Sequence, residues 1–309
     1  MKTAALVVDW GQPALTIAAL QSLAAMTPAP DLLIRVDNGS PGLGIEPVSE
    51  SAPQGTILVD LPMNIGWPAA VNIGMEVALS NGADWTLILN NDATVSSTCL
   101  GRCIEEAERH ERVAIIGPAV AFYDRPDILW FAGGEVSSWF AFTRHRGLLQ
   151  PSSAPPPSSD TGFVSGCCFV VSSAAWRSVG PFRADYFAYY EDAEWCQRAK
   201  SLGWRCRYLG DVLCLHKVSV TWSTPGSLGL SAGMAYYLAR NPLRFALDTP
   251  ARFRRAARVL GIMVIWNGYN ALRAIRSRNV SVVKAYLQGL KDAFQGRMGR
   301  RPVSTDSRA

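Results

Sequence analysis

A buried strand that ends in three polar side chains is the strongest constraint on how this chain can fold. The apolar run at 85–89 leads directly into Asn90, Asn91 and Asp92. Such a run is typical of a strand covered on both faces of a parallel sheet, and hydrocarbon cannot satisfy the polar groups at its end. Open α/β sheets bind ligands at the carboxyl ends of their strands, where a metal-bound diphosphate could meet these oxygens. An Asx turn before a helix that starts near Ser96 would also explain the triplet.

The composition fits a globular protein with a substantial core. The chain has 309 residues, of which 49% are hydrophobic, enough for one large α/β domain with an appendage or for two modest domains. Seven cysteines, without CxxC or zinc-type spacing, indicate reduced thiols and a cytoplasmic protein. The N-terminal apolar run is too short for a signal sequence, and no run approaches the roughly 18 apolar residues that span a bilayer.

Strand-like and helix-like segments alternate through the first 120 residues. We expect strands at 3–9, 32–37, 56–60, 85–90 and 113–116, and helices at 13–25, 68–80 and 97–110. Continuous apolar strands separated by amphipathic helices predict an α/β fold whose sheet is mainly parallel and covered by helices on both faces. This half of the chain is expected to bind a nucleotide.

The later segments are less regular. The Pro- and Ser-rich stretch at 150–160 predicts a loop, either a mobile lid or a plain surface connection. Beyond it, the spacing of apolar residues predicts a helix at 191–202 and a strand at 205–215 that leads to His216.

Two segments of the first half have residue types suited to a nucleotide. Asp37 ends a predicted strand and begins a turn that can expose its carboxylate to a base or a ribose, although the same residues also form ordinary turns. Around Asn64, Gly66 permits close backbone approach, and the helix that follows points amide donors at an anion. Gly74 inside that helix allows either ligand approach or tight packing against the sheet.

Two candidates for chemistry lie in the second half. Glu191 and Asp192 follow an aromatic segment, and Glu194 adds a third carboxylate; crowding there could raise a pKa enough to make a general base. The same acids would also complement a helix dipole without any catalytic role. His216, after a strand, is either a metal ligand or a structural hydrogen-bonding residue.

Together these motifs resemble family 2 glycosyltransferases, in particular their rhamnosyltransferase-like branch. The order and spacing match from about residue 3 to about residue 245, and the motifs that carry the resemblance are Val36-Asp37-Asn38-Gly39-Ser40, Asn64-Ile65-Gly66, Leu89-Asn90-Asn91-Asp92-Ala93, Ser165-Gly166-Cys167-Cys168, Tyr189-Tyr190-Glu191-Asp192 and His216. The resemblance implies a GT-A fold, a nucleoside-diphosphate sugar donor, Mg²⁺ or Mn²⁺, and inversion at the anomeric carbon.

The resemblance also implies roles for single residues. Asp192 would be the catalytic base, with Glu191 beside it, and Asp37 would contact the base or ribose of the donor. Asp92 would bind the metal that bridges the diphosphate, and His216 would be a further metal or diphosphate ligand. Asn90 stands where many relatives have the first Asp of a DxD motif. The other expected donor-binding residues are Asp9, Asn64, Asn72 and Asn91.

Two positions depart from the family pattern. Gly11 stands where many relatives have Asn, and Pro41-Gly42 replaces an acid that often follows the Asn-Gly-Ser turn. These changes concern the acceptor and the nucleoside contacts, whereas the expected metal and base positions are intact.

The resemblance implies a GT-A catalytic domain at 1–245, with a nucleotide-binding half to about 120 and an acceptor half beyond it. The expected reaction moves rhamnose or a similar sugar from a dTDP- or UDP-sugar to a saccharide or lipid-linked acceptor, in polysaccharide or glycolipid assembly. A catalytically silent nucleotide-sugar or membrane-surface binding protein is the alternative. A nicotinamide dehydrogenase is set aside, because the glycine-rich fingerprint after the first strand is missing.

The remaining segment, 246–309, is expected to form a basic helical extension. Arginines flank the apolar run at 259–266 on both sides, whereas base-stacking aromatics and nucleic-acid modules are missing, so no nucleic-acid partner is expected. The helix could lie in the interface of an anionic membrane with Trp266 at its boundary, which would place the protein peripherally at the inner face of the cell membrane. It could equally pack on the catalytic domain with a solvated basic face.

Overall fold

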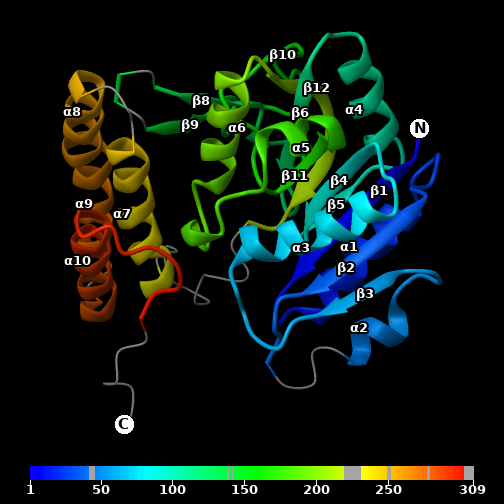
Figure 1. Ribbon diagram of the computed structural model, residues 1–309, viewed down its shortest axis with the longest axis horizontal. Helices are drawn as coiled ribbons and strands as arrows, with labels where there is room; N and C mark the ends of the chain where they lie inside the picture. The colour runs from blue at the N-terminus through cyan, green and yellow to red at the C-terminus, as the bar shows by residue number, and fades with distance from the viewer. Residues whose placement is uncertain are drawn as a thin grey trace. The chain divides into compact units, whose positions relative to one another are not determined.

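A mixed, mainly parallel sheet organises the first part of the chain (Figure 1). The computed structural model describes residues 1–41, 46–137, 139–140, 142–218, 231–248, 252–276 and 279–302. The strands are β1 (Thr3–Asp9), β2 (Leu32–Asp37), β3 (Ile57–Asp60), β4 (Trp85–Asn90), β5 (Ala93–Val95), β6 (Val113–Phe122), β7 (Leu129–Phe131), β8 (Gly134–Val136), β9 (Thr143–His145), β10 (Ser159–Asp160), β11 (Cys168–Ser172) and β12 (Arg205–His216).

The helices of this part are α1 (Pro13–Ala24), α2 (Glu46–Ser51), α3 (Trp67–Ser80), α4 (Cys99–Glu108), α5 (Ser173–Val179) and α6 (Glu191–Ser201), with a short 3₁₀ turn, η1 (Ala184–Tyr186), before α6. The large sheet has the order β10-β12-β6-β11-β4-β1-β2-β3. Strands β3, β2, β1 and β4 are parallel, and β6 and β12 are parallel to each other. Strand β11 lies antiparallel between β4 and β6. The polar end of β4 therefore belongs to the same edge as the ends of β1, β2 and β3.

Helices cover both faces of the parallel strands, as the sequence predicts. The chain moves one way across the sheet from β1 through α1 to β2, and the opposite way from β3 through α3 to β4. Because such crossovers are right-handed, α1 and α3 lie on opposite faces. Gly74 of α3 is packed so closely on the sheet that a Cβ there would lie 2.4 Å from Cδ1 of Leu6. Tight packing therefore explains this glycine.

Strand β6 is longer than the sequence predicts. The expected strand ended at Ile116, whereas the observed strand continues through Gly117 and Pro118 to Phe122. Pro118 pairs with Leu209 of β12 next to a register shift in that strand. A proline is tolerated in a sheet at such an irregularity because the ladder there does not need its missing N–H.

The Pro- and Ser-rich stretch at 150–160 is tied to its surroundings. The backbone N–H of Ser152 donates to the carbonyl of Asp127 at 2.8 Å. The hydroxyl of Ser158 accepts from the N–H of Gly210 at 2.9 Å, and β10 then pairs with β12. These contacts are those of a surface connection.

All seven cysteines are buried and carry free thiols, as the sequence predicts. Five of them lie on β11, β12 and α4, namely Cys168, Cys206, Cys214, Cys99 and Cys103. Burial and its thiol neighbours raise the pKa of Cys214 well above its usual value. A thiol of this kind is inert toward solvent reagents in the folded state.

The chain forms two compact units, and each contains more than one segment of the sequence. The N-terminal unit comprises 1–136, 143–183 and 191–221, and the C-terminal unit comprises 137–142, 184–190 and 222–309. The helices of the C-terminal unit are α7 (Ala232–Leu247), α8 (Arg252–Gly261), a π-helical turn η2 (Ile262–Trp266), α9 (Asn267–Arg276) and α10 (Val280–Phe294). The expected boundary at 245 falls inside α7. No helix in the described ranges is long and apolar enough to cross a bilayer.

A proline inside α7 links two helices of the C-terminal unit. Pro242 has no N–H to donate to the carbonyl of Leu238, one helical turn earlier. The indole N–H of Trp266 donates to this carbonyl at 3.0 Å. Trp266 is thus partly buried and tied to α7 through its indole N–H, and its expected place at a membrane boundary stays a prediction.

Candidate active site

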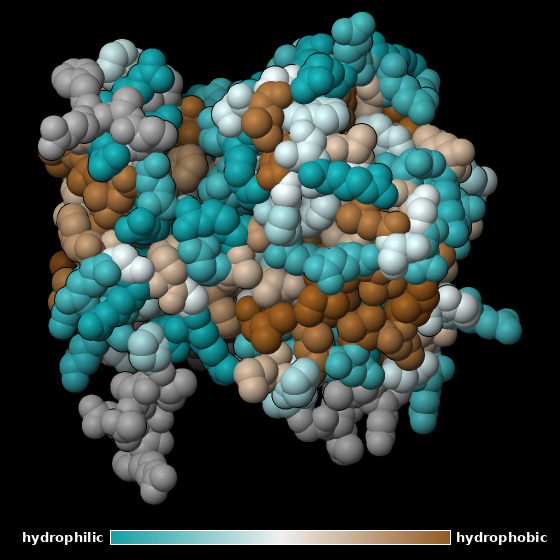
Figure 2. All heavy atoms as spheres, in the orientation of Figure 1, coloured by the Kyte–Doolittle hydropathy of each residue, from teal (hydrophilic) through white to brown (hydrophobic). Residues whose placement is uncertain are grey.

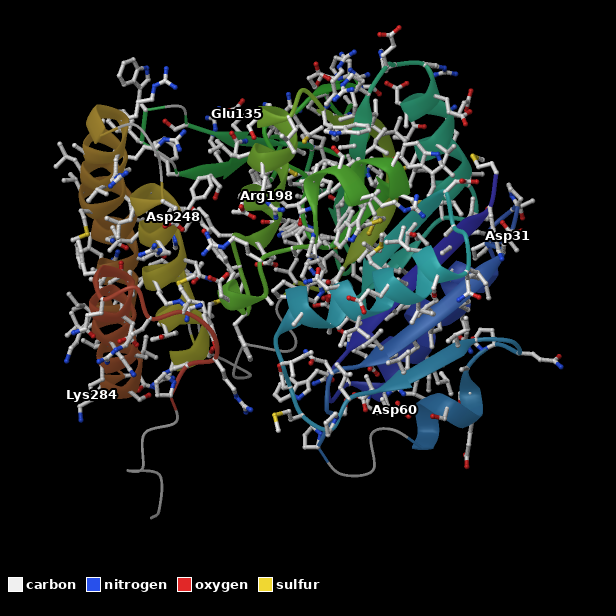
Figure 3. The ribbon with its side chains drawn as sticks, in the orientation of Figure 1. Asp31, Asp60, Glu135, Arg198, Asp248 and Lys284 are labelled. Atoms are coloured by element: carbon white, nitrogen blue, oxygen red, sulfur yellow. The ribbon has the colours of Figure 1, made fainter. Side chains whose placement is uncertain are left out.

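Three aspartates end three neighbouring parallel strands. Asp9 of β1 pairs in register with Asp37 of β2, which pairs in register with Asp60 of β3. Because the strands are parallel, the carboxylates lie in a row at the carboxyl edge of the sheet, and Figure 3 labels Asp60 at the end of β3. Asp9 and Asp37 were expected at the site, whereas Asp60 was missed.

A buried arginine lies among these carboxylates. The side chain of Arg35 is fully buried, and its guanidinium lies 3.1 Å from Asp9 and 3.6 Å from Asp37, both also buried. A second guanidinium nitrogen lies 2.9 Å from half-exposed Asp60. Burial raises the pKa of Asp9 to about 6 even though Arg35 opposes the shift. Arg35 thus makes this concentration of negative charge tolerable.

We expect Arg35→Met to lower the free energy of unfolding by about 3–5 kcal/mol, because it leaves buried carboxylates without their counter-charge. The loss should be smaller at pH 5 than at pH 8. Acid protonates Asp9, whose pKa is already raised, and a neutral carboxyl costs less to bury. Urea unfolding at the two pH values measures both effects.

Arg125→Met is the matched control for this experiment. Arg125 pairs with Asp127 at 3.5 Å, and both side chains are 67% exposed. Solvent-exposed pairs contribute little to stability. Equal losses in the two variants would contradict the role given to Arg35.

The turn after β2 is organised by Asp37 and two asparagines. One carboxylate oxygen of Asp37 accepts from the backbone N–H of Ser40 at 2.9 Å and from its hydroxyl at 2.6 Å. Asn38 donates to the side-chain oxygen of Asn64 at 3.2 Å, which also accepts the N–H of Gly66 at 2.9 Å. The other oxygen of Asp37 has no hydrogen-bond partner among the described residues. Asp37 is thereby held in place, with this second oxygen 3.6 Å from the guanidinium of Arg35.

Asn72 has a defined structural contact. Its side-chain amide donates to the carbonyl of Phe182 at 2.9 Å and accepts the N–H of the same residue at 3.0 Å. These bonds tie α3 to the segment that precedes α6. A direct contact between Asn72 and a nucleotide stays a prediction.

The triplet after β4 places Asp92 against His216. Nε2 of His216 lies 3.2 Å from Oδ1 of Asp92, and both side chains are only 8% exposed. Pairing of β12 with β5, the strand that directly follows Asp92, brings the two residues together. Oδ1 of Asn90 is buried without a hydrogen-bond partner in the described structure, and Asn91 donates to Thr16 at 3.3 Å.

This arrangement suits one divalent cation. Two ligands of an octahedral Mg²⁺ ion lie about 3 Å apart, close to the Asp92–His216 separation. The described residues contain no group of three or more metal-binding side chains. Mg²⁺ sites in phosphate-handling enzymes use one or two carboxylates and complete the shell with phosphate oxygens and water. Asp92, and beside it His216, are thus the residues of this edge that could hold a divalent cation.

Trp130 of β7 adds an aromatic contact to His216 that sequence reasoning missed. Its ring packs edge-on against the imidazole with centroids 4.4 Å apart. Such packing restricts how the imidazole can rotate, and therefore which nitrogen faces Asp92. A tryptophan 86 positions away carries no sequence signal for this role.

Glu191 and Asp192 form the first turn of α6. Oδ2 of Asp192 accepts the backbone N–H of Gly166 at 3.0 Å, and Oδ1 accepts the N–H of Ala193 at 2.7 Å. The next residue after Gly166, Cys167, accepts the N–H of Asn90 through its carbonyl at 2.9 Å. Two adjacent residues, Gly166 and Cys167, thus hold the candidate base and the end of β4.

Burial changes how both carboxyls titrate. It raises the pKa of Glu191 well above its usual range, and the charge of Asp192 adds to the effect. Burial also raises the pKa of Asp192, but the N–H groups of Gly166 and Ala193 oppose this shift. Two adjacent carboxyls whose environments differ in this way are typical of sites that need one protonated and one ionised group.

Comparisons with known proteins identify the family. A sequence model of the family described as Glycosyl transferase family group 2 matches residues 85–284. This range includes Asp92, Asp192 and His216, whereas Asp9 and Asp37 precede it. An N-acetylglucosaminyl-diphospho-decaprenol L-rhamnosyltransferase of Mycobacterium tuberculosis is 26% identical over 241 residues, which are 67% of this chain and 74% of that protein.

Solved structures of similar shape have the GT-A fold. TarS of S. aureus aligns with a TM-score of 0.59 and 14% identity over 96% of this chain, which spans about half (49%) of TarS. TarS 1–349 in complex with UDP aligns with a TM-score of 0.54 and 14% identity, over 99% of this chain and 95% of that chain. The mannosyltransferase PcManGT from Pyrobaculum calidifontis, in complex with GDP-Man and Mn²⁺, aligns with a TM-score of 0.56 and 12% identity. The alignment covers 96% of this chain and 88% of PcManGT.

Proposed function

The chain belongs to glycosyl transferase family group 2, and we propose that it is a metal-dependent, inverting enzyme that moves a sugar from a nucleoside diphosphate to an acceptor hydroxyl. One observation carries this proposal. Asp192 is bonded to Gly166, and the adjacent Cys167 is bonded to Asn90 at the end of β4, two positions before Asp92. A base and a diphosphate-binding residue are thereby held by the same short segment.

The proposed reaction uses Asp192 as the general base. Its carboxylate takes the proton of the acceptor hydroxyl while that oxygen attacks the anomeric carbon, and the bond from this carbon to the diphosphate breaks. In-line attack inverts the configuration. Asp92 and His216 would hold Mg²⁺ or Mn²⁺, which when bound would neutralise the charge that develops on the leaving diphosphate. Burial and the charge of Asp192 raise the pKa of Glu191 and so favour its neutral form, which makes Asp192 the preferred candidate for the base.

The relatives support the proposed donor and acceptor classes. UDP is bound in the TarS structure, and GDP-Man with Mn²⁺ is bound in PcManGT. The mycobacterial relative is named for a diphospho-decaprenol acceptor and for rhamnose. We therefore propose a dTDP- or UDP-sugar donor, with rhamnose or a similar sugar, and a lipid-linked or saccharide acceptor. Asp9, Asp37, Asn64 and Asn91 are proposed to surround the donor, within polysaccharide or glycolipid assembly.

A panel of nucleotide sugars tests the proposed function. Release of nucleoside diphosphate from dTDP-rhamnose, UDP-sugars and GDP-mannose is measured with Mg²⁺, with Mn²⁺ and with EDTA. We expect metal-dependent release from a subset of donors, faster when an acceptor is added. Donor binding without any hydrolysis or transfer would instead support a catalytically silent nucleotide-sugar binding protein.

A peripheral contact with membrane lipid is part of the proposal. The run from α8 through η2 to α9 exposes large apolar side chains at helical spacing, each at least half exposed: Leu260, Val264, Ile265, Tyr269, Leu272 and Ile275. Figure 2 shows hydrophobic residues along the left edge, where Figure 1 places α8 and α9. An apolar face with nearby arginines is typical of helices that lie in an anionic lipid interface.

Exposed basic side chains lie on the same two helices and on α10. Arg254 on α8 and Arg276 on α9 are exposed, as is Lys284 on α10, which Figure 3 labels. Arg278 and the side chain of Arg252, also expected here, lie outside what the structure describes. The free thiols support a reducing compartment, so we propose the inner face of the cell membrane as the location.

We expect the protein to pellet with anionic vesicles but not with neutral ones, and salt should weaken this binding. The double change Leu272→Glu and Ile275→Glu should reduce pelleting at least several-fold, because it puts two charges into the apolar face. Leu149→Glu is the matched control, since Leu149 is 69% exposed but belongs to the N-terminal unit. Pelleting that does not depend on lipid at low salt would refute the membrane contact.

A further inference from the structure

The segment that leads into the candidate base has an unusual backbone. Phe187, Tyr189 and Tyr190 have φ angles of 66°, 68° and 74°, in the left-handed region that side-chain-bearing residues rarely adopt. Tyr190 is joined directly to Glu191 and hence to Asp192. Backbone in such a conformation persists only where its surroundings hold it, and it is concentrated at functional sites.

Asn241 of α7 lies at the centre of the contacts that hold this segment. Its side chain is completely buried, and Nδ2 lies 3.1, 2.6 and 2.8 Å from the carbonyl oxygens of Tyr186, Ala188 and Tyr189. A side-chain amide has two N–H groups, so the three carbonyl oxygens of the turn share the two donors of this one nitrogen. A side chain that only accepts hydrogen bonds, such as a carboxylate, could not bond these carbonyls in place of Asn241.

Arg240 fixes the orientation of that amide. Its Nε donates to Oδ1 of Asn241 at 2.8 Å, which leaves Nδ2 facing the carbonyls of the turn. Nη2 donates to the carbonyl of Tyr186 at 2.7 Å. Arg240 is also completely buried, with its guanidinium 5.2 and 5.0 Å from the rings of Tyr236 and Tyr237. A buried charge with this many partners is rigid.

Aromatic packing continues along the same segment. The ring of Phe187 stacks on Tyr237 with centroids 5.3 Å apart and planes at 11°. The ring of Tyr190 meets Phe245 edge-on at 5.8 Å. Backbone and side chains of 186–190 are thus both held by α7.

We propose that Arg240 and Asn241 are positioning residues for the transfer reaction. They hold the backbone of 186–190 in the conformation that starts α6 at Glu191 and directs the carboxylate of Asp192 to Gly166. This inference rests on the proposed role of Asp192 as the base. It assigns the C-terminal unit a part in the chemistry, because α7 and 186–190 belong to that unit and the chain continues from Tyr190 into the base.

The test compares Asn241→Leu with Asn270→Leu. Asn270 is 1% exposed in the same unit, and its amide donates to the carbonyl of Trp266 one turn earlier in its own helical run, so the two changes remove similar groups. We expect Asn241→Leu to lower kcat about 10- to 100-fold, because small displacements of a catalytic group have effects of this size. The donor KM and the donor dissociation constant from calorimetry should stay within twofold. A kcat loss no greater than that of Asn270→Leu would overturn the proposal.

Two further measurements separate positioning from loss of fold. Hydrogen exchange of the amides at 186–192 should accelerate in Asn241→Leu and stay unchanged in Asn270→Leu. If Asn241→Leu does not fold, Asn241→Ser, which keeps one donor, replaces it in both assays. Arg240→Lys should retain more of kcat than Arg240→Met, because lysine keeps a donor and the charge. Absence of transfer in the wild type would defeat the proposed function, and exchange would still decide whether Asn241 holds the segment.

Discussion

Replacement of Asp192 by asparagine is expected to reduce sugar transfer by about 10²- to 10⁴-fold, the usual contribution of a general base, while nucleotide-sugar binding is retained. The amide has nearly the shape of the carboxylate and can still accept the N–H of Gly166. It cannot take a proton. Steady-state transfer rates together with calorimetric donor affinity measure the two parts of this prediction.

The pH profile gives the same prediction an independent readout. Burial raises the pKa of Asp192, so the wild-type rate should be lost, as pH falls, above the range of an ordinary aspartate. In Asp192→Asn this acidic limb should disappear from what activity remains. Glu194→Gln, two positions further along the same helix, is the matched control, because that carboxylate pairs with Arg198 at 3.0 Å. Near-normal turnover of Asp192→Asn would move the base elsewhere, with Glu191 the first candidate.

Asp92→Ala is expected to abolish the metal-dependent part of donor binding. Asp92 and His216 are the two residues that fit the cation, and the imidazole alone does not neutralise it. Titration of the nucleotide sugar by calorimetry, with Mg²⁺ or Mn²⁺ and then with EDTA, should show a metal effect in the wild type and none in the variant.

Asp84→Ala is the control for this experiment. Asp84 directly precedes β4, whereas Asp92 lies just beyond the other end of the same strand. The side chain of Asp84 is 59% exposed and accepts the backbone N–H of Lys2. A donor affinity that is the same with and without metal in both the wild type and Asp92→Ala would remove Asp92 from the metal site.

Much of the polar edge of the sheet could be predicted, because polar residues directly follow apolar strand-like runs in the sequence. Apolar runs that end in Asp37 and Asn90 predict buried strands and place polar residues at one edge of a parallel sheet. The GT-A fold and the family were predicted from these motifs, and both are confirmed. The roles given to individual residues stay predictions.

Contacts that depend on spatial order could not be predicted. In the sequence, Arg35 is a charged residue inside an otherwise apolar strand. Only the register of β1, β2 and β3 shows that it lies among three aspartates. Likewise, chain order gives no reason to insert β11 antiparallel between β4 and β6. That insertion brings the segment with Gly166 beside the end of β4.

The support of the candidate base was missed for a different reason. In the sequence, Arg240 and Asn241 are two polar residues of an amphipathic helix, where solvent exposure is the default expectation. Their burial follows from the turn at 186–190, whose carbonyls they bond, and the left-handed φ values at Phe187, Tyr189 and Tyr190 have no sequence signature.

The interleaving of the two compact units limits how this protein can be shortened. Residues 184–190 belong to the C-terminal unit but lie between two segments of the N-terminal unit. Arg240 also donates to the carbonyl of Gly299 at 2.6 Å, near the end of the described chain. A truncated protein that lacks the C-terminal helices, made to improve expression or to avoid detergent, would therefore lose the support of its own base. Neither unit can be excised, exchanged between relatives or produced alone as one continuous piece of the chain.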